Sequence, residues 1–189
     1  YLWGGQGGTY SDNSWHNITI VVDQGVNGSM VLYVDGTIED SWSGNLSIDV
    51  SNSDNLLVGI DRNYNNSINA YIDNTAIWDI ALSQAEIQSY MSTSPTGSES
   101  GLVGYWNCNE GSGLTAADQT SNGNDGTLIS MDVGWSTDVP VIGCTDSYAD
   151  NYNSNANYDD GSCAYPDAGD YSLSFDGDGD YVIIDNPSN

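Results

Sequence analysis

We predict an all-β fold for this 189-residue chain, built as an antiparallel sandwich with one short helix. Three observations lead to this prediction. Apolar and polar residues alternate with a period of two over most of the chain, which is the period of a half-buried strand. Turn sequences such as Asp35-Gly36 separate the alternating runs. A helix-capping signature is found at only one place, in residues 82–91.

The first half of the chain predicts four strands. Residues 14–23 and 28–37 are alternating runs rich in β-branched residues, and a glycine-bearing connection joins them. Residues 55–61 and 68–82 continue the same pattern. We expect these strands to pair in antiparallel fashion, because short glycine-bearing connections of this kind make hairpins.

The helix and two further strands complete the pattern. Within residues 82–91, Ser83 is followed three residues later by Glu86, which is the capping box of a helix N-terminus. A polar connector with proline and glycine follows, and residues 101–113 then predict another strand. Residues 120–129 predict a turn followed by a strand.

The charge of the chain is strongly one-sided. It carries 27 acidic residues against a single basic residue, Arg62, and its formal net charge is -26 at pH 7. Nucleic acid and anionic membrane surfaces are bound through lysine and arginine, so we expect neither as a partner. Self-repulsion of this size opposes a compact state unless cations screen or coordinate it. Calcium is the expected cofactor, because it is bound by oxygen ligands.

Composition and cysteine placement predict a secreted, extracellular protein at the cell surface. No apolar run approaches the ~18 residues of a membrane-spanning helix, so membrane insertion is not expected. Cys144 and Cys163 enclose a short polar loop, and we predict a disulfide between them, worth about 3 kcal/mol by loop closure. Cys108 lies among aromatic and apolar residues and is expected to be a buried free thiol.

Five successive segments resemble one known family. They read SWHNITIVVD, MVLYVDG, LLVGID, AYIDNTAIWDIALSQAEI and GLVGYWNCNEGSGLTAADQTSNGNDGTL. In this order they resemble the laminin-G-like jelly rolls of the concanavalin A-like type, and the resemblance covers most of residues 10–135. It implies a concanavalin-like antiparallel β-sandwich.

The resemblance also implies three parts in the chain. Residues 1–140 resemble a laminin-G-like jelly roll whose N-terminal strands are missing. Residues 141–167 resemble a Cys-flanked linker module with the pattern GCTD…DDGSC, found between domains of bacterial surface proteins. Residues 168–189 contain DYSLSFDGDGDYVIID, which resembles the opening strands of a jelly roll. We expect them to belong to the next domain of an array, or to the same domain in permuted order.

The loop between the two cysteines is the first candidate calcium site. Asn and Asp recur there at every second position, so that successive side-chain oxygens can converge on one ion. The alternative is a solvated Asn/Asp turn that the disulfide holds rigid. The candidate ligands are Asp146, Asn151, Asn153, Asn155, Asp159 and Asp160.

Two further segments are candidate calcium sites. One contains Asp118, Asn124 and Asp125 in a turn-rich stretch, where the resemblance implies a structural calcium. The other contains Asp176, Asp178 and Asp180, which alternate with glycine. Ordinary turn chemistry is the alternative for the first segment, and a glycine-rich hairpin with exposed carboxylates is the alternative for the second.

The sequence predicts no enzyme activity. Asp73 and Asp79 come nearest to the carboxylate pair of a glycoside hydrolase, and the resemblance assigns them to a structural strand. His16 is the only histidine and has no nucleophile beside it. We find neither a nucleophile elbow nor a zinc-ligand spacing.

Aromatic residues in predicted loops are candidates for carbohydrate binding. The chain has 6 tryptophans and 13 tyrosines, and sugars stack on such rings. Ordinary packing at the rim of the sandwich is the alternative for each ring. The candidates are Trp3, Tyr10, Trp42 and Tyr64.

Two functions follow from these features. The favoured one is a structural or adhesive repeat unit of a secreted, calcium-stabilised fibre, whose partners are neighbouring copies in a tandem array or a head-to-tail polymer. The other is a carbohydrate-binding module of an exported protein or enzyme, with glycans as partners. In the first case residues 171–175 pair with the body of a neighbour, whereas pairing with their own body would give a monomer.

Overall fold

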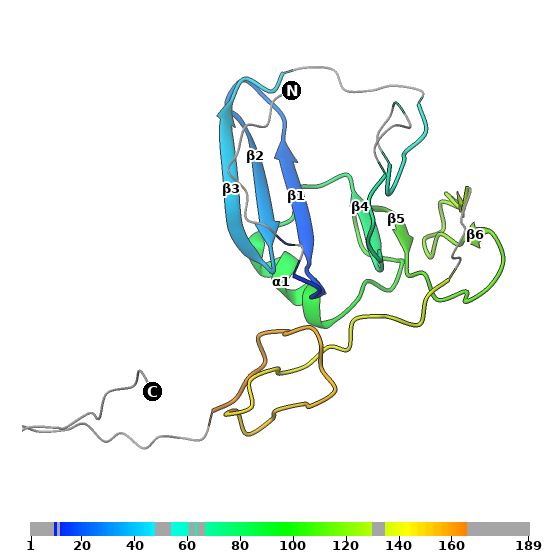
Figure 1. Ribbon diagram of the computed structural model, residues 1–189. Helices are drawn as coiled ribbons and strands as arrows, with labels where there is room; N and C mark the ends of the chain where they lie inside the picture. Colours follow the sequence, from blue (N-terminus) through cyan, green and yellow to red (C-terminus); the bar gives the residue numbers. More distant parts are fainter. Residues whose placement is uncertain are drawn as a thin grey trace, which may run out of the picture.

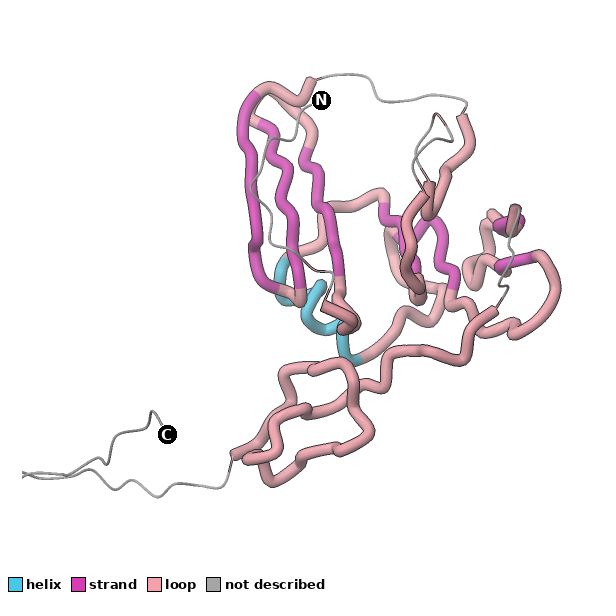
Figure 2. The backbone as a smooth tube through the Cα atoms, in the orientation of Figure 1, coloured by secondary structure: helices cyan, strands magenta, loops and turns pink. Residues whose placement is uncertain are grey.

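The computed structural model describes residues 10, 12–47, 54–60, 63, 67–129 and 135–165. These residues contain antiparallel sheets and a short helix (Figures 1 and 2), so the predicted all-β class is confirmed. In chain order the elements are β1 (Ile18–Asp23), β2 (Gly28–Val34), β3 (Thr37–Gly44), β4 (Thr75–Trp78), α1 (Gln84–Ser92), β5 (Leu102–Trp106), β6 (Thr115–Ala116) and β7 (Gly126–Thr127).

The first sheet contains β1, β2 and β3 in sequence order, all antiparallel. Ile20 lies opposite Leu32, and Met30 lies opposite Trp42, so these side chains share one face of the sheet. The register between β2 and β3 shifts by a bulge between Leu32 and Tyr33. The alternation seen in the sequence therefore gives this sheet one strongly apolar face.

The tight turn between β2 and β3 is where α1 joins the sheet, at its lower end in Figure 1. Asp35 and Gly36 have φ of 49° and 69°, the left-handed pair of a type I′ hairpin turn. The side-chain amides of Gln84 and Gln88 both donate to the Gly36 carbonyl, at 2.8 and 3.1 Å. A Cβ at Gly36 would meet Met91 Sδ at 2.8 Å, so the contact with the helix requires glycine.

The helix α1 begins at the predicted capping box. The Glu86 N–H donates to Ser83 Oγ at 3.3 Å, and the Ser83 N–H donates to Glu86 Oε2 at 2.7 Å. Ile87 is buried. The ring of Tyr90 lies 5.1 Å from the ring of Trp78, so the helix also contacts the second sheet.

The second sheet pairs β4 with β5, and β6 with β7 form a two-residue ladder beyond it. Thr75 lies opposite Trp106. The Trp106 ring folds over Gly104, where a Cβ would lie 2.5 Å from the ring. The buried Tyr105 donates its hydroxyl to Asn74 Oδ1 at 2.6 Å.

Two predicted strands are shorter than expected, because left-handed residues interrupt them. Asn74 has a φ of 51°, so residues 68–82 yield only the four residues of β4. Cys108 has a φ of 53°, so the strand predicted over residues 101–113 ends as β5 at Trp106. Local backbone geometry of this kind is not visible in an alternating pattern.

The strand predicted at residues 55–61 was a wrong prediction. Among its described residues only Ile60 forms an isolated bridge, to Ser67. Leu56 and Val58 are exposed, and no described strand lies beside them to pair with their backbone. β-propensity alone does not make a strand when a neighbouring strand is missing.

The apolar face of β1 is open to solvent. Ile18, Ile20 and Val22 keep 63%, 60% and 43% of their surface exposed. Their neighbours across the sheet are better covered, and Val34 is buried. The buried apolar residues of the body are Tyr33, Val34, Leu46, Ile87, Met91, Leu102 and Tyr105.

Residues 141–165 form a disulfide-closed loop below α1 in Figure 1. Cys144 and Cys163 are bonded as predicted, with their Cα atoms 4.8 Å apart, and Cys144 is fully buried. Cys108 is free as predicted, although it is only partly buried. A single bridge between Ile142 and Tyr158 joins the two arms of the loop.

Candidate functional site

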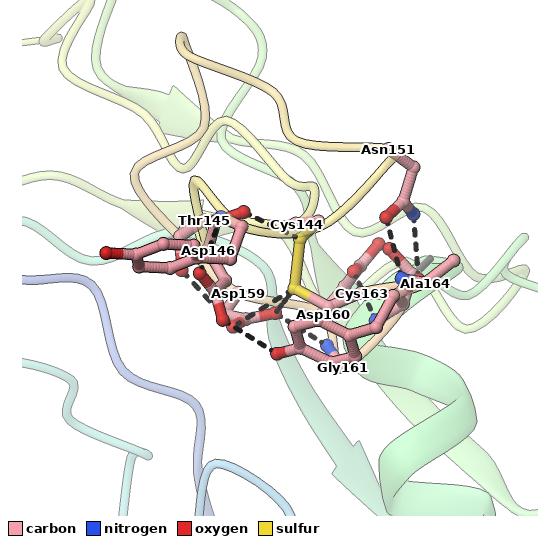
Figure 3. The surroundings of a disulfide bond; sticks show 12 residues. Cys144, Thr145, Asp146, Asn151, Asp159, Asp160, Gly161, Cys163 and Ala164 are labelled. Atoms are coloured by element: carbon pink, nitrogen blue, oxygen red, sulfur yellow. Dashed lines mark hydrogen bonds between the residues drawn. A yellow bond between two sulfur atoms is a disulfide. The ribbon is translucent and has the colours of Figure 1, made fainter. Parts of the chain in front are cut away.

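Side-chain amides of the disulfide loop form hydrogen bonds with backbone groups near both ends of the loop, and Figure 3 shows those of Asn151. Asn151 Oδ1 accepts from the Ala164 N–H at 2.7 Å, and Asn151 Nδ2 donates to the Ser162 carbonyl at 2.8 Å. Asn157 bridges the backbone of the preceding segment in the same way, at 2.6 and 3.2 Å. Both amides therefore stabilise the shape of the loop.

The carboxylates of the loop organise its turns. Asp146, Asp159 and Asp160 each accept a hydrogen bond at 2.9 Å from the backbone N–H two residues later. The Tyr165 hydroxyl also donates to Asp146 at 2.8 Å, and the Thr145 hydroxyl donates to Asp159 at 3.2 Å. The backbone bond, and then the bond from Tyr165, hold the pKa of Asp146 below its ordinary value of 3.8.

Calcium binding by this loop stays a prediction. In the described part of the chain, no three Asp, Glu, His or Cys side chains lie close enough together to hold a metal ion. Asn153 Oδ1 accepts from the Asn155 N–H at 3.1 Å, so this amide also has a local partner. An ion would have to draw these oxygens together in exchange for their present hydrogen bonds.

The second candidate segment is organised around Asp118. Its Oδ1 accepts from the backbone of Tyr105 and Thr120, and its Oδ2 accepts from the Thr120 hydroxyl and the Asn124 N–H, all at 2.9–3.0 Å. Burial tends to raise the pKa of Asp118, but these bonds outweigh it and lower the pKa below 3.8. Asp125 accepts from the Asp118 N–H at 2.9 Å. The three predicted residues thus share one turn, where calcium stays a prediction.

Several predicted site residues lie outside the described residues. They are Asp176, Asp178, Asp180, Trp3 and Tyr64. Of the other candidate aromatic residues, Tyr10 meets the ring of His16 edge-on at 5.2 Å. Trp42 is 37% exposed, and its ring folds over the glycine at position 44.

A cleft lies between the body and the disulfide loop, and the sequence did not predict it. It has a volume of about 480 Å³. Asp35, Gln88 and Met91 line it from the body, and Asp159 and Asp160, with the adjacent glycine, line it from the loop. Carboxylates therefore lie on both sides, with no basic residue in the lining. The sequence showed Asp35 only as part of a turn, far from the loop along the chain.

Tyr158 lies close to this acidic cleft. It is 8% exposed, and its buried hydroxyl has no hydrogen-bond partner. Burial, followed by the charges of Asp35, Asp160 and Asp159, raises its pKa above 10.0. The tyrosine therefore stays neutral beside the carboxylates at physiological pH.

Asp35 also binds the single histidine of the chain. His16 Nδ1 lies 2.8 Å from Asp35 Oδ2, and His16 Nε2 lies 3.2 Å from Asp12 Oδ1. The hydrogen bond with Asp35 raises the pKa of His16 above 6.5, although burial opposes it. His16 thus joins two acidic segments, and both carboxylates favour its protonated form.

The carboxylate pair considered for catalysis is separated by β4. Asp73 precedes this strand and Asp79 follows it, and four strand residues span about 13 Å. Glycoside hydrolases hold their two carboxyl groups about 5–9.5 Å apart. Burial raises the pKa of Asp73, and its carboxylate accepts from the Asn74 N–H at 2.9 Å. This geometry fits a structural role for Asp73.

Comparison with known proteins finds a family match for the first part of the chain. Residues 3–88 match the Laminin_G_3 family, which is described as the concanavalin A-like lectin/glucanases superfamily. No curated protein and no solved structure matches the chain. In the described part of the chain, no helix is long and apolar enough to cross a membrane.

Proposed function

We propose that the chain is a structural or adhesive repeat unit of a secreted, calcium-stabilised fibre, and the match of residues 3–88 to the concanavalin A-like lectin/glucanases superfamily supports an adhesive module. The family and the Cys144–Cys163 disulfide indicate an extracellular domain, since disulfides persist in oxidising compartments. In this proposal the unit has no catalytic role, and its partners are neighbouring copies, joined head to tail.

The open apolar face of β1 is the observation that carries the proposal. Ile18, Ile20 and Val22 form a row on one face of an edge strand, and each keeps at least 43% of its surface exposed. Full burial of an exposed side chain of this size is worth about 1.5–3 kcal/mol, and roughly half of that remains to be gained at each of the three. A neighbouring unit that covers this row would stabilise each contact between units by burying the three side chains.

The acidic charge supports the calcium part of the proposal. Units with a formal charge of -26 repel one another unless cations intervene. Asp35 and the carboxylates of the disulfide loop face the same cleft without a basic residue in its lining. Cations that bind there or within the loop would lower repulsion at the joint between body and loop.

The test is the assembly state of the purified 189-residue chain. We expect light scattering after gel filtration to show mass growing with concentration in calcium, and electron microscopy to show linear particles. Chelation should shorten them, whereas sodium chloride at matched ionic strength should not restore them. A monomer at high concentration with calcium present would contradict the fibre.

A carbohydrate-binding module is the second candidate, because the family description names lectins and Trp42 remains 37% exposed. Binding of glycans to an array of immobilised sugars is the measurement. A signal that Trp42→Ala removes and Trp78→Phe keeps would favour this function. Trp78 is a suitable control because its ring packs on Tyr90 of α1.

A further inference from the structure

We propose that residues 171–175 of a second copy add as a strand to the outer edge of β1 and cover the row Ile18, Ile20 and Val22. This inference rests on the proposed head-to-tail assembly and names the surfaces that join. It assigns the donor, YSLSF, and the acceptor, the β1 edge.

The acceptor is an edge without the usual protection against pairing. β1 pairs with β2 on one side, and no described strand lies along its other side. The residues from Ile18 to Val22 are all uncharged and β-branched, and the first charge is Asp23 at the end. Long uncharged edges of this kind are templates for strand addition.

The other edges are less suited to accept a strand. β3 carries Glu39 and Asp40, and its ladder with β2 is broken by a bulge. Charges and bulges are the devices that protect edge strands. β4 and β5 are only four and five residues long. Of the two edges of the first sheet, β1 therefore offers the longer uncharged run.

The donor matches the acceptor in period and in charge. Tyr171, Leu173 and Phe175 alternate with two serines, so one face of the extended segment is apolar. No residue from 171 to 175 is charged, although Asp170 and Asp176 flank the segment. Two strongly acidic copies can approach most closely where both are neutral, and both segments meet that condition.

The position of the donor favours a second copy. The described chain ends at Tyr165, whose hydroxyl donates to Asp146 at 2.8 Å. The segment 166–189 follows the disulfide loop along the chain. In this proposal the loop lies at the joint between units, where the donor can reach the neighbour.

Photo-crosslinking tests the contact directly. A benzophenone amino acid replaces Ile20 in a chain labelled with heavy nitrogen, and this chain is mixed with unlabelled chain before irradiation. We expect mass spectrometry to find heavy residue 20 joined to light residues 171–175. The same probe at Thr19, which alternates with Ile20, should give several-fold less product.

Paired charge substitutions test the same contact without a probe. Leu173→Asp and Ser172→Asp add the same charge at neighbouring positions of opposite parity. We expect Leu173→Asp to weaken association by about tenfold or more and Ser172→Asp to leave it nearly unchanged. Ile20→Asp and Thr19→Asp form the matching pair on the acceptor.

The outcomes separate this inference from the proposed function. Crosslinks within a single chain would overturn the second copy as donor. Linear particles without crosslinks between residue 20 and 171–175, or with equal effects of the parity pairs, would overturn this contact and leave the fibre standing. A chain that stays monomeric in every condition and gives no crosslink would overturn both.

Discussion

At the scale of single residues, most described carboxylates accept local hydrogen bonds. Glu99 is a clear case, because hydrogen bonds lower its pKa to about 2. The largest effect comes from the Thr96 N–H, and the Thr96 hydroxyl and the Gly97 N–H add to it. Asp118 and Asp146 are used in the same way. Backbone N–H and hydroxyl donors thus stabilise these carboxylates in a chain whose only basic residue apart from His16 is Arg62.

His16 predicts a dependence of stability on pH. Its pKa in the folded protein is raised above 6.5, mainly by Asp35, so its stabilising effect is fully present below pH 6.5. This effect is lost as the pH rises through the folded-state pKa. In the parent chain we expect the free energy of unfolding to fall by about 0.2–1 kcal/mol as the pH rises above 6.5. His16→Gln should remove this fall. Urea unfolding at several pH values measures it, and parallel curves for both proteins would contradict it.

Asp118 predicts a stability loss that does not require calcium. Asp118→Asn replaces one accepting oxygen by an amide nitrogen. It therefore leaves either the Thr120 hydroxyl and the Asn124 N–H, or the N–H groups of Tyr105 and Thr120, without an acceptor. We expect a loss of about 1–3 kcal/mol in the presence of chelator. Asp138→Asn, at an exposed position, is the control. A loss seen only with calcium would show that Asp118 acts as an ion ligand.

At the scale of elements, the contact between α1 and the β2–β3 turn holds the body together. Two glutamine amides of the helix bind the Gly36 carbonyl, while Ile87 and Met91 are buried. The Asp35 next to this glycine also binds His16 and lines the cleft. One turn therefore connects the sheet, the helix and the disulfide loop.

Substitution at this turn should separate steric contact from backbone strain. Gly36→Ala introduces a Cβ 2.7 Å from Gln88 Cγ at φ 69°, whereas Gly111→Ala has a similar φ of 65° with no atom within 4 Å. We expect losses of about 2–4 kcal/mol for the first and about 1 kcal/mol for the second. Thermal unfolding provides the measurement. Equal losses would mean that α1 moves away at little cost.

At the scale of the whole molecule, the structure combines a strong negative charge with an open apolar face. The charge keeps copies apart, and the exposed row on β1 favours their contact. In the proposed fibre, cations would shift this balance toward assembly. The disulfide contributes separately, because it holds a loop whose few buried residues include Ala149 and Tyr158.

Calcium should stabilise the chelator-treated chain. An ion that binds only the folded state adds about 2.7 kcal/mol when its concentration is a hundred times the Kd. We expect the melting temperature to rise with calcium and to rise much less with sodium chloride of equal ionic strength. Combined replacement of Asp159 and Asp160 by Asn should reduce the calcium effect. An unchanged melting temperature on adding calcium would contradict the prediction.

Much of the local structure was determined by the sequence itself. The alternating runs predicted β1, β2, β4 and β5 but missed β3, Asp35-Gly36 predicted the hairpin turn, and Ser83 with Glu86 predicted the start of α1. These features depend on neighbours within a few residues, so local pattern is enough to reveal them. The Cys144–Cys163 disulfide was equally accessible, because the two cysteines close one short loop.

Only the tertiary structure decided which residues meet across the chain. Asp35 faces Asp159 and Asp160 in one cleft, although nothing in the sequence near Asp35 marks it as part of a site. Strand ends depended on left-handed residues such as Asn74. Residues 55–60 form no strand beyond the single bridge of Ile60 to Ser67, because pairing requires a neighbour in space. Exposure of the β1 row is also a tertiary property. Alternation shows that a strand has an apolar face, but the surrounding chain determines whether that face is covered.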